Sequence, residues 1–553
     1  MRGGKALITS RASYLPVVSS GENEAAELDL NRSVPRAYIA FRGRGTRLAS
    51  AWGEGTLSLD ALVRAAPAAR SALAAAQARN VDTVEICLAH SFRSVDPPAM
   101  RRELSNVHRG VRGLALRLNS AHRLHSPTEM LARNLRFDRA IERFLEENGA
   151  AFGDLGHGVK VEAFEATQFL LLLDRGPRLV RMHRGNRAVK LREVTRESTE
   201  HLAERLKRWL LRNVNADGRM TYKYWPSRGE ESTANNMLRQ WMATWCLARV
   251  AKDKEEVALA RRNLEYNLAT SYREEGTLGL IVCDGKVKLG AIALATLALL
   301  EHPASEEFSS VRAALCQSVQ YLSNPDGSFR TFYKPSDRND NQNFYPGEAL
   351  LLWATLYERN AEPVLLEQIL RSFRHYRTWH ARNPNPALVP WHTQAYYKVW
   401  RTTRDPELLE FILTRNDWLL SMQQWDSAPY EDVRGQFYDP KRPEFGPPHA
   451  SSTGVYLEGL ADAHSAAKES GNEPRASSYR LAIVRGLRSL MQLQFKDDVD
   501  MFYISKRKRI EGGLRTTVYD NTVRVDNVQH SLLAVNKVLS RFGVSDYLPD
   551  SRD

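Results

Sequence analysis

Three acidic side chains lie in helical stretches that are otherwise apolar. Glu348 occurs in FYPGEALLLWATLYE, Glu458 in GVYLEGL, and Asp526 in VDNVQHSLL, where His530 follows it by one helical turn. A carboxylate in such a place must be paired or must have a shifted pKa. A carboxyl group whose pKa is moved toward neutral pH can act as a general acid or base. We therefore expect Glu348, Glu458 and Asp526 to carry the chemistry, with Tyr345 and His530 as their partners.

The same acids also fit a structural role. Buried Glu–Arg or Asp–His pairs would tie neighbouring helices together without any catalysis. The sequence leaves both interpretations open.

Polar and aromatic residues also gather at the starts of the helical segments. PWHTQAYYKVW supplies three of them, and the loops that follow short Gly-aromatic-Tyr turns are basic. A mouth lined by cations and aromatic rings suits an anionic or ring-bearing ligand. The expected substrate-binding residues are Arg239, Trp391, His392, Gln394, Lys334, Arg338, Tyr333 and Tyr438.

Composition and motifs exclude several classes of function. The 553 residues are 43% apolar and 26% charged, with a formal net charge of +13, so the chain is a basic globular protein. The four cysteines show no CxxC pairing, and no HxxxH, GxxxxGK[ST] or GxSxG motif occurs. We expect no metal site and no cofactor. The net charge favours an acidic partner, but we do not expect nucleic acid, because nothing besides charge and aromatic residues supports it.

Residues 1–195 combine strands and helices. Strands are predicted at 34–43, 81–90, 111–119 and 161–173, where the runs are β-branched or alternate in polarity. Helices are predicted at 57–80 and 126–149, the second with Ser126 as N-cap, Pro127 at the first position and Glu129 at the third. This pattern predicts an α+β domain.

Residues 196–553 contain helices broken by short loops. Twelve helical segments are expected, near 200–213, 233–250, 255–272, 287–301, 306–322, 345–359, 363–381, 388–403, 407–424, 450–468, 476–494 and 525–541. Gly218, Gly327 and Gly435 begin similar turns at spacings of 109 and 108 residues, and DMFYISKRK at 500–508 is a looser fourth instance. Such periodicity marks a repeat architecture. The prediction is an all-α (α/α)6 toroid of six helical hairpins, with the starts of its inner helices lining a mouth.

The C-terminal region resembles the six-hairpin glycosidase superfamily. The N-x-D-G-x-F-x-Y turns between helices are like those of that superfamily, and GVYLEGLADAHSAAKESGN is similar to its late inner helix. D-glucuronyl C5-epimerases and unsaturated-glucuronyl hydrolases belong to this group and act on acidic sugars. The resemblance implies a carbohydrate-active enzyme without fixing the role of any residue.

The N-terminal region resembles the AMMECR domain. The matching stretches are FRGRGTRLASAWGEGTLSLDALVRAA, HRGVRGLALRLN and VEAFEATQFLLLL. In that family an Arg-Gly-Cys motif follows the first strand, whereas here Arg42 and Gly43 are followed by Arg44. A role that depends on the family's thiol would be lost.

The sequence thus predicts a cytoplasmic hydrolase, lyase or epimerase that acts on an anionic sugar or polysaccharide precursor. The alternative is a non-catalytic scaffold in exopolysaccharide or cell-envelope biosynthesis. A peptide cyclase of the lanthipeptide type is disfavoured, because the cysteines lack neighbouring histidine motifs.

Overall fold

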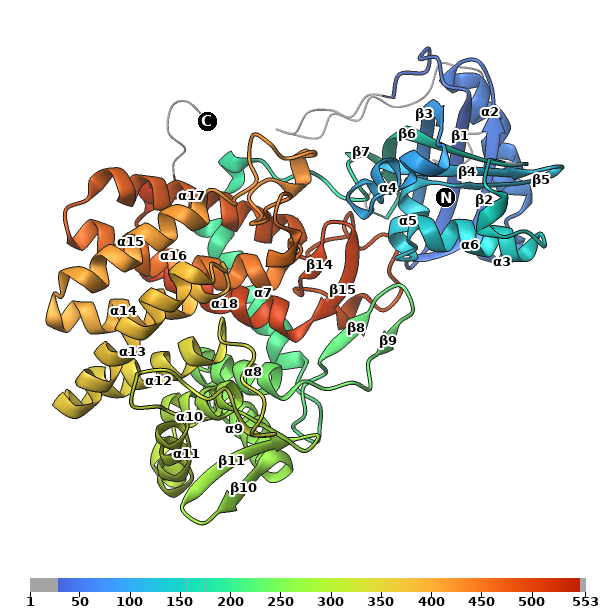
Figure 1. Ribbon diagram of the computed structural model, residues 1–553. Coiled ribbons are helices and arrows are strands. Elements are labelled where there is room, and N and C mark those ends of the chain that lie inside the picture. The colour runs from blue at the N-terminus through green and yellow to red at the C-terminus, as the bar shows by residue number, and fades with distance from the viewer. Residues whose placement is uncertain (1–27, 157, 175, 548–553) are drawn as a thin grey trace.

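A β-rich N-terminal part is followed by a helical C-terminal part in the computed structural model (Figure 1). The structure describes residues 28–547 except 157 and 175. The predicted change from α+β to helical organisation is confirmed at this level. Helix α7 (Arg196–Arg212) is the first long helix of the second part, and a domain boundary at residue 195 stays a prediction.

One antiparallel sheet forms the N-terminal part. Its strand order is β2-β1-β3-β6-β4-β5, with β7 also paired to β6. The strands are β1 (Arg36–Gly43), β2 (Thr46–Glu54), β3 (Thr83–Ser94), β4 (Arg112–Leu118), β5 (Ala121–His125), β6 (Val159–Leu172) and β7 (Arg178–Met182). The predicted strands correspond to β1, β3, β4 and β6. The sequence prediction missed β2, β5 and β7, because their many exposed positions leave no continuous apolar run.

Each of the two helices predicted in this region is broken. The first becomes α2 (Ser58–Ser71) and α3 (Ala75–Ala78), and the second becomes α5 (Pro127–Ala132) and α6 (Phe137–Glu147); a short α4 (Met100–Glu103) was not predicted. Asn134 has a φ of 48°, in the left-handed region, which ends α5. The predicted N-cap is confirmed, because the Ser126 hydroxyl accepts a hydrogen bond of 3.1 Å from the Glu129 amide.

The helical part pairs each inner helix with an outer one. The inner helices are α8 (Met237–Val250), α10 (Leu289–Glu301), α12 (Tyr345–Asn360), α14 (Leu388–Thr403), α16 (Ala450–Glu469) and α18 (Val525–Leu539). The outer helices are α7, α9 (Lys254–Ser271), α11 (Ser309–Tyr321), α13 (Pro363–Arg382), α15 (Pro406–Leu420) and α17 (Glu473–Leu493). Every inner helix packs against the next one along the chain, and α18 packs against α8. The series of contacts between inner helices therefore begins and ends at α8.

Short strands interrupt the helical part, where the sequence predicted only helices and loops. They are β8 (Lys223–Trp225), β9 (Glu230–Glu231), β10 (Tyr272–Glu275), β11 (Leu278–Cys283), β12 (Lys286–Lys288), β13 (Phe332–Lys334), β14 (Arg515–Thr517) and β15 (Asp520–Arg524). Most contain only a few residues, too few for a pattern of alternating polarity to identify them. All of them lie in connections that lead from an outer helix to the next inner helix, and β10, β11 and β12 lie in the connection from α9 to α10.

A glycine with positive φ recurs after four outer helices. Its φ lies between 87° and 92°, and an added Cβ would come within 2.0–2.6 Å of a backbone carbonyl oxygen of another outer helix. The four are Gly218, Gly327, Gly435 and Gly512. The fourth instance expected at 500–508 is wrong, because Gly512 occupies the equivalent place and packs on α7. The repeat seen in the sequence is therefore a device for packing loops against outer helices.

The two parts of the chain are joined by buried polar contacts. The Arg184 guanidinium pairs with the Asp432 carboxylate at 2.6 Å, and both side chains are buried. The hairpin formed by β14 and β15 lies between the two parts in Figure 1, where the Asn521 amide donates to the Leu131 carbonyl at 2.7 Å. Among the described helices, none combines the length and the apolarity that crossing a membrane requires.

Substituting Gly435 by alanine tests the packing role of the repeated glycine. The new Cβ would lie 2.0 Å from the Arg485 carbonyl oxygen, so we expect a clear loss of stability. Gly446→Ala is the matched control, because Gly446 also has positive φ but has no described atom within 4 Å of the added Cβ. The difference between the two variants should be about 1–3 kcal/mol, measured as a lower Tm for Gly435→Ala. Equal Tm values would contradict the packing role.

Candidate active site at the starts of the inner helices

Connections of very different length lie at the two ends of the inner helices. The turns from an inner to an outer helix are short, as from Asn360 to Pro363 and from Thr403 to Pro406. The connections that lead into the inner helices are longer, as from Arg212 to Met237 and from Leu420 to Ala450. The starts of the inner helices therefore lie beneath the long loops, which is where binding residues commonly occur.

Glu348 lies in the first turn of α12 and is almost completely buried, with 4% of its surface exposed. Its Oε2 atom points at Gly290 on α10, since a Cβ added to that glycine would lie 1.9 Å away. Among the described residues, Oε2 has no hydrogen-bond partner. Burial raises the pKa of Glu348 to about 7, and the nearby charge of Arg239 only partly opposes this shift. The carboxyl group therefore titrates near neutral pH, well above its usual range.

Asp526 lies in the first turn of α18 and is fully buried, but its charge is compensated. The Arg524 Nε donates to Oδ1 at 2.9 Å, and the Arg239 Nε lies 3.2 Å from Oδ2. The Arg239 contact is an ion pair rather than a hydrogen bond, because its Nε has no aligned acceptor among the described residues. Burial alone would raise the pKa of Asp526, but the two guanidinium groups outweigh it and hold this pKa below its usual value. Asp526 is therefore an anion.

Glu458 and His530 form a buried pair between α16 and α18. The His530 Nδ1 lies 2.8 Å from the Glu458 Oε1, so a proton on Nδ1 is shared with the carboxylate. When His530 is neutral, this contact fixes its tautomer and leaves the lone pair on Nε2. The Trp391 ring of α14 packs edge-on to the His530 ring, with 6.0 Å between centroids. This arrangement can accept or return a proton.

A second polar layer lies deeper in the same group of helices. The Lys537 Nζ donates to the Asp462 carboxylate at 2.8 Å, to the Gln394 side-chain oxygen at 2.8 Å and to the Glu458 carbonyl at 3.1 Å. Burial lowers the pKa of Lys537 to about 8. Gln394, predicted to bind substrate, is thus bonded within this layer.

The structure brings together most of the predicted acids and their partners. Arg239 is near both Glu348 and Asp526, and Tyr345 packs beside Glu348, where burial and that carboxyl raise the pKa of the phenol. His392 lies elsewhere: its Nδ1 is 2.8 Å from the Tyr396 hydroxyl, and its ring packs against Tyr376 and Phe411 of outer helices. Adjacent positions on α14 therefore send Trp391 toward α18 and His392 toward the outer layer.

The predicted residues of the loops have local partners. The Tyr333 hydroxyl and the Lys334 Nζ both bond Glu275, at 2.7 and 3.1 Å. Arg338 pairs with Asp340 at 2.8 Å and stacks on Phe332. Tyr438 makes its hydrogen bonds through its backbone, to Met422 and Gln424.

Sequence reasoning missed Arg524 and Gly290. Arg524 precedes Asp526 by two residues, and its bond depends on the β15–α18 junction that no pattern indicated. Gly290 is a glycine at the start of an apolar helix, a signal that often marks close packing.

A cavity of about 210 Å³ lies beside the starts of α8 and α10. Its lining includes the side chains of Asn235, Asn236, Lys286 and Lys288. Burial lowers the pKa of Lys288, and neighbouring Lys286 adds to this effect. Cations here offer a binding place for an acidic group.

No protein-family model matches the chain, and no curated protein matches it in sequence. Solved structures that it is similar to include D-mannose isomerase, at 11% identity and a TM-score of 0.48, with 63% of this chain and 98% of that chain covered. An inactive α-1,6-mannanase variant of Salegentibacter sp. HEL1_6 matches at 9% identity and a TM-score of 0.44, covering 62% and 99%. Unsaturated glucuronyl hydrolase from Streptococcus agalactiae matches at 12% identity and a TM-score of 0.42, covering 64% and 94%. The function of this chain must follow from its own side chains.

The raised pKa of Glu348 predicts a pH-dependent effect of Glu348→Gln on stability. The folded-state pKa of about 7 exceeds the unfolded-state value of about 4.3, so the folded wild type loses stability as pH rises between them. Glutamine does not titrate, and the stability gained by the variant should grow by roughly 1.4 kcal/mol per pH unit over that interval. Above about pH 7 the gain should become constant. Unfolding both proteins with denaturant across this pH range measures the difference between their free energies of unfolding. A difference that does not change with pH would contradict the raised pKa of Glu348.

Proposed function

We propose that this protein is a carbohydrate-active enzyme that uses the starts of its inner helices to act on an anionic sugar or polysaccharide precursor. The observation that carries the proposal is the contrast between Glu348 and Asp526. Both acids lie near Arg239, yet burial raises the pKa of Glu348 toward neutral pH, and the arginines hold the pKa of Asp526 below its usual value. Two carboxyl groups with separated pKa values are what general acid–base chemistry on a sugar requires.

Each acid has a role in this proposal. Protonated Glu348 is the general acid, which donates to a departing or reacting oxygen. His530, oriented by Glu458, is the base, and Asp526 stabilises positive charge that develops on the substrate. Tyr345 stands beside the acid as its partner. A hydrolase, a lyase and an epimerase all fit this set.

The substrate class rests on two further features. The resemblance of the Gly-aromatic turns and of the 454–472 stretch to six-hairpin glycosidases selects carbohydrates. The cations at the small cavity, Lys286 and Lys288, lie where they would bind a carboxylate or a similar group. Trp391, which is buried against His530, would stack on a sugar that displaces the residues covering it. Arg239, Gln394 and the loop residues Tyr333, Lys334, Arg338 and Tyr438 complete the proposed binding set. His392 faces the outer helices and would act only by holding α14 in place.

The proposal includes the finer architecture. We infer that the helical part is an (α/α)6 toroid of six hairpins, supported by the contacts that run from each inner helix to the next. The relation of the N-terminal part to the AMMECR domain is supported by matching stretches in β1, α2, β4 and β6. The enzyme would act in the cytoplasm.

A non-catalytic binding protein of polysaccharide or cell-envelope biosynthesis is the second candidate. The observation that favours it is the low exposure of the acids: Glu458 and Asp526 are 0% exposed, and His530 is 4% exposed. Substrate would have to displace covering residues to reach them. In this second case the acids only join helices.

Turnover of defined anionic oligosaccharides tests the enzymatic proposal. Product formation is followed by NMR for wild type, Glu348→Gln, Glu458→Gln and the control Glu255→Gln, whose side chain is exposed in the first turn of α9. We expect Glu348→Gln and Glu458→Gln to lower kcat by at least about 100-fold with little change in binding, as loss of a general acid or base does. Glu255→Gln should behave as wild type.

Binding with no turnover in any of the four proteins would assign the chain to the scaffold class. Turnover that survives both buried substitutions would remove the chemistry from this group of residues. Asp526 is left out of the test, because its loss would leave two arginines unpaired and endanger folding.

A further inference from the structure

A cavity of about 780 Å³ lies where the N-terminal part meets the helical part. It shares no residue with the candidate active site. The N-terminal part contributes Arg44, Asp82 and Asp174, and α7 contributes Trp209 and Arg212. The rest of the lining is the segment 505–509, SKRKR.

Close packing holds the two sides of this cavity together. A Cβ added to Gly45 would lie 2.1 Å from the Ile504 carbonyl oxygen, so the loop after β1 touches the 501–505 segment directly. The buried Arg42 guanidinium stacks on Phe502, with 5.4 Å to the ring centroid. The segment 505–509 therefore lies between the loop after β1 and the helical part, where the Lys506 Nζ also bonds the Gly229 carbonyl of the connection into α8.

Positive charge dominates the cavity. Six basic side chains line it against two acidic ones. Three of the cations already have carboxylate partners outside the lining: Arg507 pairs with Asp498 at 2.6 Å, Arg509 with Glu231, and Arg212 with Glu511 at 3.7 Å. The Lys506 Nζ donates to the Gly229 carbonyl at 2.8 Å. Arg44 is exposed, and its backbone amide donates to Asp82 at 2.6 Å. Arg44, Lys506 and Lys508 have no carboxylate partner among the described residues, and a bound anion would supply one.

We propose that this cavity binds a small ligand that carries two or more phosphate groups. Its volume falls in the range of small-molecule sites, and guanidinium groups match phosphate oxygens in bidentate geometry. The carboxylates of Asp82 and Asp174 in the lining disfavour a long polyanion that runs through the cavity. Because both parts of the chain supply cations, the ligand would bridge them and stabilise their docking.

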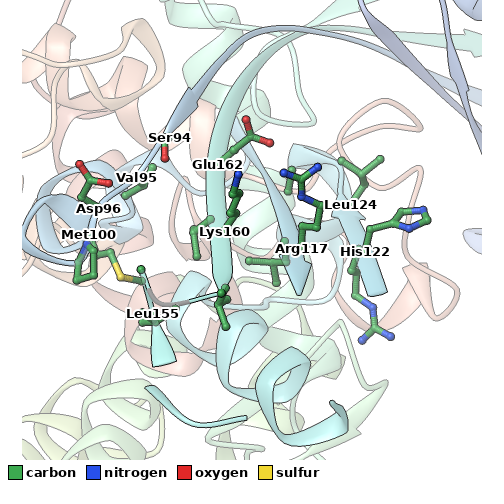
Figure 2. Close-up of a pocket in the computed structure, with 18 of the residues that line it drawn as sticks. Ser94, Val95, Asp96, Met100, Arg117, His122, Leu124, Leu155, Lys160 and Glu162 are labelled. Carbon is green, nitrogen blue, oxygen red and sulfur yellow. The ribbon is translucent and has the colours of Figure 1, made fainter. Parts of the chain in front are cut away.

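A second large cavity of the described chain provides a contrast. It has a volume of about 670 Å³ and lies on the N-terminal sheet, where Figure 2 shows acidic and basic side chains interspersed. In Figure 2 Glu162 lies beside Lys160 and Arg117, and Asp96 lies on the other side of the cavity near Met100. Arg36 pairs with Glu54 at 3.2 Å. Its charges compensate one another, so it does not favour a polyanion.

Calorimetric titration of the full-length protein with pyrophosphate tests the proposal. The titration is run in about 0.15 M salt, where distant charges are screened. We expect saturable binding and a higher Tm for the wild type with pyrophosphate. Arg44→Gln and Lys508→Gln should each weaken the affinity about tenfold, the loss expected for one charge-assisted bond. Lys441→Gln, which removes an exposed cation from another loop, is the matched control and should bind as wild type.

Absence of saturable binding, or equal affinity in Arg44→Gln, Lys508→Gln and wild type, would overturn the proposal. Binding of a uronic-acid disaccharide in place of pyrophosphate would also overturn it, because the ligand would then be a carboxylate. The outcome is independent of the turnover experiment, since the two sites have no residue in common. Circular dichroism of each variant confirms that the fold is retained.

Discussion

The ion pairs of Asp526 are the interaction on which the helical part and its site both depend. Asp526 belongs to α18, the last inner helix, and Arg239 belongs to α8, the first. Their contact joins the two ends of the series of inner helices, where no chain connection does so. A buried carboxylate needs this compensation, because removing an uncompensated charge from water costs several kcal/mol. Arg239 also acts on Glu348, where its charge partly opposes the rise in pKa that burial causes.

The N-terminal part contributes to this arrangement through the β14–β15 hairpin. One end of the hairpin delivers Arg524 to Asp526, while Asn521 near its middle bonds the Leu131 carbonyl of the N-terminal part. A change in the docking of the two parts would therefore reach Asp526 through only a few residues. The basic segment 506–509 makes a second connection between the parts. The same hairpin therefore contacts both the N-terminal part and Asp526 of the site.

Glycines allow close packing at a buried acid and at the repeated loops. Gly290 leaves space for the Glu348 carboxyl, which keeps that carboxyl buried and so raises its pKa. The glycines at 218, 327, 435 and 512 let loops approach the backbone of outer helices. A glycine loses more conformational entropy on folding than any other residue, and this loss destabilises the fold. The close packing that these glycines permit offsets that loss. The positions of small residues thus shape the site as much as its charged ones do.

The sequence by itself determined the long helices of the helical part, the Ser126 cap, the main strands of the first part and the acids in apolar surroundings, because these follow from local periodicity and polarity. It did not determine the short strands, the partners of Asp526, the outward direction of His392 or the place of the 506–509 segment. Those depend on contacts between residues far apart in the chain and on the rotation of each helix about its axis. Only tertiary packing fixes both, because a helix carries several polar side chains and its neighbours decide which of them are buried together.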